Sequence, residues 1–320
     1  MANLTSPDSE FRSELGAVLD LSARTKLRIT GADRLRYLNG QISNDLRKAS
    51  EISAIHACVL NVKGKVDADV FIAADGDSFV LDTNPDLSET LIARLDRYII
   101  ADDVQVEDVT DAFALYHVVG GEEPVLSVKG KSRAAIRFGT AGIDIWVDRA
   151  LHEVAWLELS RALPVMSDED AEILRVELGL PRWNRELTGE IIPTEANLEN
   201  IVVDFAKGCY IGQEVISRIK MSGQTNKRLC GLSVAGPHAL PAGWRLVAPE
   251  EQKDVGWITS SVVSPRYGRI ALGFLKRGFQ AAGLQLQARP AEGARERIAV
   301  TVVPLPFASR DRSPTTGEAD

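Results

Sequence analysis

The sequence is short of cysteine. Its 320 residues include three, Cys58, Cys209 and Cys230, which are widely spaced and odd in number. They cannot form the disulfide framework of a small secreted domain, and at least one thiol must stay unpaired. Nor can they supply the four thiolates of a conventional iron–sulfur cluster from one chain. We therefore expect a protein of the reducing cytoplasm that holds no stable metal.

Positive charge is also in deficit. Lys and Arg total 37 against 45 Asp and Glu, which gives a net charge of −8, and basic residues occur singly or in pairs. A nucleic-acid site would need a local basic patch against this unfavourable field. No apolar stretch approaches the roughly 20 residues of a membrane-spanning helix, and residues 1–12 lack the basic start and apolar run of a secretory signal. We expect neither nucleic acid nor a membrane among the partners, and a cytoplasmic location.

Several catalytic signatures are missing as well. Residues 129–132, Lys-Gly-Lys-Ser, end like a phosphate-binding loop, but Val125 occupies the position that requires the first glycine. The sequence has no G-x-G-x-x-G after a strand and no G-x-S-x-G, and its four histidines are too dispersed for a local metal motif. Local motifs therefore point to no nucleotide-binding, serine-hydrolase or zinc chemistry.

The first two thirds of the chain mix strands with helices. Asp86 and Glu89 form a capping box before Leu91, Leu95 and Tyr98, which recur at helical spacing. A second helix is expected from Ser167 or Asp168 up to the stop at Gly179. Strands and helices do not alternate strictly, so the fold class is predicted to be α+β. The expected strands occupy residues 55–60, 67–73, 79–82, 104–109, 115–119 and 143–147.

After Gly223 the sequence pattern changes to short strand-like segments separated by Gly or Pro. This pattern predicts a small barrel or sandwich. We place a first region at residues 1–225, a C-terminal β-barrel at 226–306 and a tail at 307–320. The tail carries charge, Pro and Gly without apolar partners, so we expect it to be disordered. The six strand candidates are residues 229–234, 244–247, 256–263, 270–275, 284–288 and 298–303.

The most distinctive segment is residues 207–214, Lys-Gly-Cys-Tyr-Ile-Gly-Gln-Glu. Apolar residues at the spacing of a buried helix face follow it, and its two glycines suggest a tight approach into that helix. Cys209 would then lie near a helix N-terminus, where unpaired N–H groups and the neighbouring Lys207 favour the thiolate. The residues alone leave open a second interpretation, a buried and inert cysteine in a glycine turn.

This segment resembles the signature of the YgfZ family, K-G-C-[YF]-x-G-Q-E, and contains every letter of it. Eukaryotic relatives in that family act in iron–sulfur protein maturation. The resemblance extends from about Leu15 to Val303 and includes residues 35–45, 60–66, 94–98 and 192–198. It implies that Cys209 is the functional thiol. The other signature residues are Lys207, Gly208, Tyr210, Gly212, Gln213 and Glu214.

A member of this family is similar in fold to the T-protein of glycine cleavage, an aminomethyltransferase that uses tetrahydrofolate. The resemblance therefore implies a folate-binding region of two lobes, discontinuous in sequence, followed by a C-terminal β-barrel. It also implies tetrahydrofolate or a derivative as cofactor, and iron–sulfur client or assembly proteins as partners.

Four residues are candidates for contacts to the folate. Glu195 stands in a Pro-x-Glu context similar to that of T-protein-like chains, and a carboxylate can accept two hydrogen bonds from a pterin. A solvated loop glutamate is the alternative. Arg228, at the entrance to the last region, is placed where a cation could meet the anionic glutamate tail, although an ordinary surface residue is equally compatible.

The other two candidates are Asp67 and Asp69, in the region where T-protein-like chains carry an aspartate pair near the reactive nitrogen of folate. Here Ala68 separates them, so on a strand both point to one face, where like charges repel or mark an exposed edge. This departure weakens an aminomethyltransferase interpretation.

We thus expect a tetrahydrofolate-binding protein that supports assembly or repair of iron–sulfur proteins through Cys209. The competing interpretation is a folate-dependent aminomethyl- or methyltransferase in which Asp67 or Asp69 assists at the folate nitrogen. A scaffold without a ligand is a third.

Overall fold

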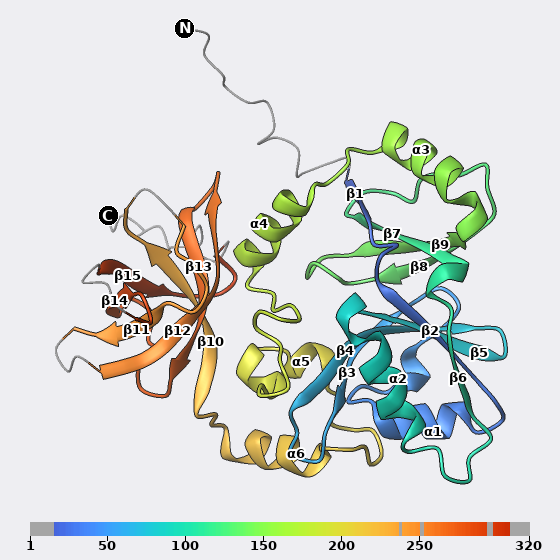
Figure 1. The fold of residues 1–320 in the computed structure, drawn as a ribbon, viewed down its shortest axis with the longest axis horizontal. Coiled ribbons are helices and arrows are strands. Elements are labelled where there is room, and N and C mark those ends of the chain that lie inside the picture. Colours follow the sequence, from blue (N-terminus) through green and yellow to red (C-terminus); the bar gives the residue numbers. More distant parts are fainter. Residues whose placement is uncertain (1–15, 237–238, 250–252, 293–296, 308–320) are drawn as a thin grey trace, which may run out of the picture. The chain divides into compact units, whose positions relative to one another are not determined.

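The computed structural model describes residues 16–236, 239–249, 253–292 and 297–307. The chain divides into two compact units, shown with their elements in Figure 1. The first comprises Met1–Ser167 and Leu187–Gln224, and the second comprises Asp168–Glu186 and Thr225–Asp320.

A five-stranded antiparallel sheet forms one half of the first unit. Its strand order is β3-β4-β5-β2-β6. The consecutive strands β3, β4 and β5 are therefore neighbours, and β2 lies between β5 and β6. The expected strands at residues 55–60, 67–73, 79–82 and 104–109 are all confirmed, and the strand that precedes them near residue 25 had not been predicted. The bounds are β2 (Thr25–Thr30), β3 (Ile55–Leu60), β4 (Val66–Asp75), β5 (Ser78–Thr83) and β6 (Gln105–Asp108).

The two faces of this sheet differ in polarity. One face is apolar: Val70, Ile72, Leu81 and Leu27 are fully buried, as a half-buried sheet with period-two alternation requires. The other face is polar, because the strand register places His56 opposite Phe71, Phe71 opposite Asp82 and Asp82 opposite Lys26. Cys58 and Asp69 pair on that same face.

Two helices accompany the five-stranded sheet, α1 (Arg34–Gln41) and α2 (Ser88–Asp96), and Figure 1 shows them beside it. The hydroxyl of Tyr37 donates to the carbonyl oxygen of Leu95 at 2.6 Å and so ties the helices together. The expected capping box at Asp86 is wrong. A short turn precedes α2, and the Asn84 side chain caps it by accepting from the Asp86 N–H. The helix ends at Asp96, so Tyr98 lies beyond it.

A four-stranded antiparallel sheet, in the order β1-β7-β9-β8, forms the other half of the first unit. Helix α3 (His152–Ala162) packs on one face through Ala155 and Leu159, which join a buried cluster with Tyr116 and Ile145. The strands are β1 (Ala17–Asp20), β7 (Phe113–Val119), β8 (Gly130–Ala135) and β9 (Gly142–Asp148). Residues 130–132, rejected above as a phosphate-binding loop, begin β8.

The other face of this sheet meets the polar face of the five-stranded sheet. Leu115 and Trp146 pack with Ala73 and Val80 of the five-stranded sheet in one buried cluster. Beside this cluster, the Arg137 guanidinium contacts the carboxylates of Asp82 at 2.5 Å and of Asp144 at 2.7 Å.

Asp144 also contacts Nδ1 of His117 at 2.8 Å, and its side chain is 1% exposed. Burial alone would raise its pKa, but the Arg137 charge and the His117 hydrogen bond outweigh burial and lower it to about 2. Buried ion pairs and a shared apolar cluster therefore join the two sheets of the first unit.

The second unit is a closed barrel of six antiparallel strands in the order β10-β13-β12-β11-β14-β15. Every strand candidate in this region is confirmed, as is the α+β class with a C-terminal barrel. Alternating apolar residues of all six strands, such as Leu232, Ile258 and Val300, fill the interior. The strands are β10 (Lys227–Val234), β11 (Arg245–Ala248), β12 (Lys253–Ser264), β13 (Gly268–Lys276), β14 (Gln285–Arg289) and β15 (Ile298–Val303).

Helix α4 (Asp168–Leu178) belongs to the barrel unit, although we placed its residues in the first region. Arg175 Nη1 contacts the Glu186 carboxylate at 2.9 Å, and its Nη2 donates to the Ser260 hydroxyl on β12 at 2.7 Å. Because Glu186 is fully buried, this network fixes the helix to the strand.

The end of the chain differs in one respect from our expectation. Phe307, assigned above to the disordered tail, is fully buried, and its ring lies 6.2 Å from that of Tyr267. Residues 308–320 lie outside the described part of the structure. Among the helices that the structure describes, none is long and apolar enough to cross a membrane.

Candidate functional site

The five segments that carry the family resemblance lie in the first unit, and contacts join them to one another. Three short elements of this unit complete the region: a helical turn at Pro193–Ala196, α5 (Glu199–Val202) and α6 (Gln213–Ser222).

Lys207 is buried, with 5% of its surface exposed. Its ammonium donates three hydrogen bonds, to the carbonyl oxygens of Asn39 at 2.7 Å, Ile42 at 2.8 Å and Asn44 at 2.6 Å. An ammonium has three N–H donors, so all of them are used. Burial lowers the pKa of Lys207 to about 8, although the negative charges of Asp45 and Asp204 act to raise it.

Gly212 makes the closest packing contact of the segment. Its φ is +86°, and a Cβ atom there would lie 2.7 Å from the carbonyl oxygen of Asn61 and 3.2 Å from Cα of Gly64. Gly64 is confined in turn, because its φ is +72° and a Cβ would lie 2.9 Å from that of Val215. The Lys63-Gly64 turn and the start of α6 therefore interlock. Gly208 differs: nothing lies within 4 Å of its Cβ position.

Cys209 is exposed, whereas Cys58 and Cys230 are buried. Burial raises the pKa of Cys58 well above its ordinary value and that of Cys230 to about 11. Of the three thiols, Cys209 is thus the accessible one. Helix α6 begins at Gln213, so Tyr210, Ile211 and Gly212 separate the thiol from the helix.

The remaining signature residues support this loop. Tyr210 is buried, and burial raises its pKa to about 12. The Gln213 N–H donates to the Tyr210 carbonyl at 3.2 Å, and Glu214 is exposed and pairs with Arg218 at 2.8 Å. The ammonium of Lys207 lies 5.1 Å from the Tyr210 ring centre.

Asp67 is held by Arg94, a residue to which we had assigned no role. The guanidinium donates to Asp67 Oδ2 at 3.3 Å, to Gln41 Oε1 at 3.0 Å and to the Leu60 carbonyl at 3.0 Å. Asn61 donates to the second oxygen of Asp67 at 3.2 Å. Both carboxylate oxygens of Asp67 therefore have protein donors, and Arg94 joins three of the resemblance segments, residues 35–45, 60–66 and its own, 94–98.

Asp69 has a different environment. Its Oδ2 lies 3.5 Å from His56 Nε2, which is beyond a good hydrogen bond, and that nitrogen is buried without a hydrogen-bond partner. The His56 ring stacks on Phe71 with 4.3 Å between ring centres. Burial would raise the pKa of Asp69, but His56 and the charges of Arg24 and Arg137 outweigh it, so that pKa lies below its ordinary value. The ionised carboxylate of Asp69 keeps acceptor capacity.

Glu195 is buried in the turn at Pro193–Ala196, where its carboxylate accepts from the Ile192 N–H at 3.1 Å. The second interpretation, a solvated loop glutamate, is therefore wrong. Arg228 lies on β10 in the second unit, opposite Leu275 of β13. Its expected contact with a folate tail stays a prediction.

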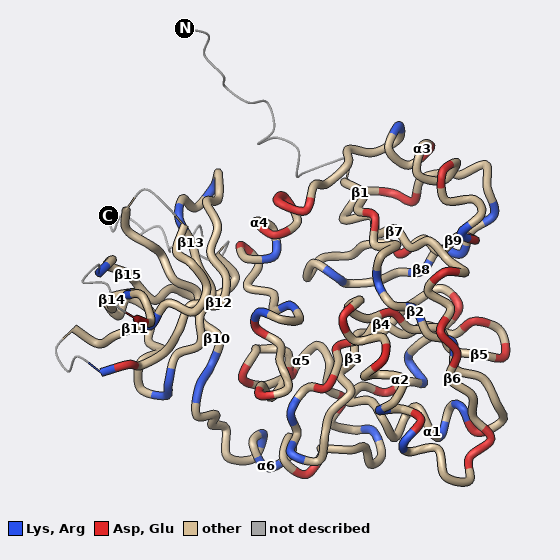
Figure 2. The backbone as a smooth tube through the Cα atoms, in the orientation of Figure 1, with Lys and Arg blue, Asp and Glu red and all other residues tan. Residues whose placement is uncertain are grey.

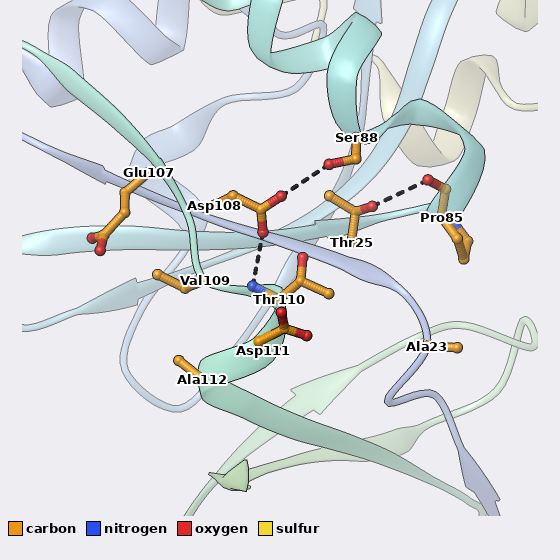
Figure 3. A pocket seen from close by; sticks show the side chains of 10 residues that line it. All are labelled: Ala23, Thr25, Pro85, Ser88, Glu107, Asp108, Val109, Thr110, Asp111 and Ala112. Carbon is orange, nitrogen blue, oxygen red and sulfur yellow. Dashed lines mark hydrogen bonds between the residues drawn. The ribbon is translucent and has the colours of Figure 1, made fainter.

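A separate cleft of about 680 Å³ opens in the first unit beside β6 (Figure 3). Its lining includes Glu107, Asp108 and Asp111, but Asp108 is engaged by Ser88 and by the Thr110 N–H, both at 2.9 Å. None of the predicted site residues lines it. Among the described residues, no three His, Cys, Asp or Glu side chains are grouped as metal ligands.

His56 and Arg94 are the residues of this region that the sequence analysis did not single out. His56 could have been found from the expected strand at residues 55–60, since alternation places it on the face that carries Cys58 and Leu60. No local pattern identifies Arg94, because its partners lie far away in sequence.

Comparisons with known proteins agree with this architecture. The GCVT N-terminal domain model matches residues 9–141, and the model of the glycine cleavage T-protein C-terminal barrel domain matches residues 227–308. The structure of the glycine cleavage system aminomethyltransferase T from Bartonella henselae superimposes with a TM-score of 0.79 at 18% identity, over 95% of this chain and 91% of that one.

Among curated relatives, the tRNA-modifying protein YgfZ of Shigella dysenteriae serotype 1 (strain Sd197) is 26% identical over 231 residues, which cover 67% of this chain and 70% of the relative. The protein of the same name from Escherichia coli O157:H7 (strain EC4115 / EHEC) matches with the same identity and coverage. The two domain matches, the fold and these relatives together show that the chain is a YgfZ-like protein with the fold of the glycine cleavage T-protein.

Proposed function

We propose that this chain is a tetrahydrofolate-binding protein that supports assembly or repair of iron–sulfur proteins, with Cys209 as its functional thiol. The observation that carries the proposal is the placement of the signature: the one exposed cysteine lies on a loop that Lys207 and Gly212 fix to the rest of the first unit. An exposed thiol on an ordered loop can exchange a thiol-linked group or contact a cluster on a client.

The polar face of the five-stranded sheet suits a folate. His56 Nε2 and Arg24 Nη2 are buried there without hydrogen-bond partners, which is rare in folded proteins and suits a ligand or water that supplies acceptors. Asp69 offers an ionised acceptor beside them. Because Asp67 is satisfied by Arg94 and Asn61, we assign the folate contact on this strand to Asp69. When bound, the folate would supply a one-carbon carrier.

Folate binding is tested by thermal unfolding of the purified protein with tetrahydrofolate and 5-formyltetrahydrofolate. A ligand at 100 times its Kd stabilises the folded state by about 2.7 kcal/mol. The variants Asp69→Asn and Glu195→Gln should lose most of the shift, whereas Glu107→Gln, in the separate cleft, should keep it. No shift with any reduced folate in the unaltered protein would exclude folate binding.

The role of the thiol is tested by complementation in a strain that lacks its own homologue. Cys209→Ser should abolish support of iron–sulfur enzyme activity, whereas Cys58→Ser should retain it if folding is preserved. Circular dichroism and the folate-induced shift check that both variants fold. Full client activity with Cys209→Ser would refute the assignment of this thiol.

The name of these relatives, tRNA-modifying protein YgfZ, connects them with tRNA modification. The net charge of −8, and the interspersed acidic and basic residues in Figure 2, favour an indirect connection through a modifying enzyme that needs its cluster. Cells without the protein should then lose modified nucleosides, while the purified chain shows no mobility shift with tRNA. A tRNA complex that forms at physiological salt would contradict this connection.

The competing function, an aminomethyl- or methyltransferase, is distinguished by turnover. Production of methylenetetrahydrofolate from an aminomethyl donor, retained in Cys209→Ser and lost in Asp69→Asn, would favour the enzyme over the proposal.

A further inference from the structure

A buried lysine whose ammonium bonds only to neutral carbonyl oxygens needs an explanation beyond the charge it carries. Lys207 is 5% exposed, and its three N–H donors all bond to backbone carbonyls of residues 39–44. An ammonium is costly to bury unless each donor is satisfied, so the loop conformation and the lysine require each other.

The loop that receives Lys207 is itself fixed to β3 and to α5. The Ser43 hydroxyl donates to the Val202 carbonyl at 2.5 Å and accepts from the Cys58 N–H at 2.9 Å. The Asn44 side chain donates to the carbonyl of His56 at 2.8 Å. Residues 39–44 are therefore a rigid anchor, and Lys207 attaches the Cys209 segment to it.

Backbone contacts support the same attachment. The Ile211 N–H donates to the Gly40 carbonyl at 3.1 Å, and the Asp204 N–H donates to the Ser43 carbonyl at 3.0 Å. The Cys209 loop is thus held on both sides of the thiol. None of the ammonium donors remains to stabilise a thiolate.

We propose that Lys207 is a positioning residue for the Cys209 thiol: its ammonium fixes the Cys209 loop to residues 39–44. This inference rests on the proposed function only in taking Cys209 as the working thiol. It replaces the electrostatic role that the sequence suggested for Lys207 with a mechanical one.

The experiment compares Lys207→Met and Lys207→Ala with Lys220→Met in the full chain. Lys220 lies on α6, and its ammonium lies 3.5 Å from the Phe205 ring centre. Its loss therefore removes a positive charge from the helix that follows the Cys209 loop but none of the carbonyl contacts of Lys207. Hydrogen exchange reports the order of residues 39–45 and 207–212. The rate of Cys209 alkylation by iodoacetamide against pH, read by mass spectrometry, reports the thiol pKa.

Both Lys207 variants should exchange at least about tenfold faster in these two segments, because charge-assisted hydrogen bonds are lost. The thiol pKa should be unchanged, and client support should fall with the loss of order. Lys220→Met should alter none of these. In Lys207→Ala, n-propylammonium replaces the atoms removed and should restore slow exchange, which shows that the loss is local and reversible.

A higher thiol pKa in Lys207→Met with unchanged exchange would overturn the inference, as would unaltered exchange in both variants. The exchange and alkylation measurements need neither folate nor a client protein. If Cys209→Ser retains client support, the proposed function fails, yet exchange and alkylation still decide what Lys207 does.

Discussion

The contrast between the two glycines of the signature gives the sharpest prediction. Gly212→Ala adds a methyl group where φ is +86° and where the new Cβ would lie 2.7 Å from the Asn61 carbonyl oxygen. Gly208→Ala adds the same group where no atom lies within 4 Å. The two substitutions are chemically identical and only four positions apart in one loop, so each serves as the control for the other.

The magnitude follows from two additive costs. A non-glycine residue in the left-handed region costs about 1–2 kcal/mol. A contact of 2.7 Å against backbone forces a local shift, and overpacking of this kind costs about 1–3 kcal/mol. We therefore expect Gly212→Ala to lower the free energy of unfolding of the first unit by about 2–5 kcal/mol, and Gly208→Ala to change it by less than about 0.5 kcal/mol.

The assay must read the first unit separately, because two units need not unfold together. Urea unfolding followed by pulsed hydrogen exchange of peptides from β3 and β4 provides this, and peptides from β12 report the barrel unit in the same sample. The expected loss appears in the β3 and β4 peptides alone. Equal stability of the two alanine variants, within about 0.5 kcal/mol, would refute the interlock between Gly212 and the Asn61–Gly64 turn.

Two further predictions concern buried charges. Because Arg137 and His117 hold the pKa of Asp144 to about 2, stability should be full above about pH 4 and fall by about 2 kcal/mol as the pH drops toward 2. Asp144→Asn should flatten this slope in urea titrations between pH 5 and 2.5, and an unchanged slope would contradict the assignment. In the barrel unit, Arg175→Met leaves the Glu186 carboxylate buried without its cation and should cost about 3–5 kcal/mol. Arg175→Met with Glu186→Gln should recover part of that loss, and a cost below about 1 kcal/mol in the single variant would show that the pair is not needed.

Local patterns predicted the barrel well and the first unit in part. Each barrel strand combines apolar alternation with flanking Gly or Pro, which are signals within a few residues of one another. Strand β8 was missed because Lys131 and Arg133 break the apolar pattern, and the buried Arg133 pairs with Asp75 of β4, far away in sequence. Helix α2 ends earlier than its spacing suggested, since Tyr98 stacks with Arg94 instead of extending the helix.

The part of the site that depends on a glycine was predicted from the sequence, whereas the contacts between residues far apart in the sequence were not. The tight approach at Gly212 could be read from the two glycines of the signature. The role of Lys207 could not, because its acceptor Asn39 is 168 positions away and a lysine is normally expected at the surface. The same holds for Arg94, whose contact with Gln41 spans 53 positions.

The two aspartates of β4 show how such distant partners decide function. From the sequence, Asp67 and Asp69 are equivalent carboxylates that repel each other on one strand face. In the structure Arg94 and Asn61 each donate to one oxygen of Asp67, whereas Asp69 Oδ2 lies 3.5 Å from Nε2 of His56 and is influenced by the charges of Arg24 and Arg137. A carboxylate has about four acceptor sites, so Asp67, with one donor on each oxygen, has less acceptor capacity left for a ligand than Asp69. From these contacts we expect Asp69, and not the Asp67–Asp69 pair, to be the main acceptor for a ligand on this strand.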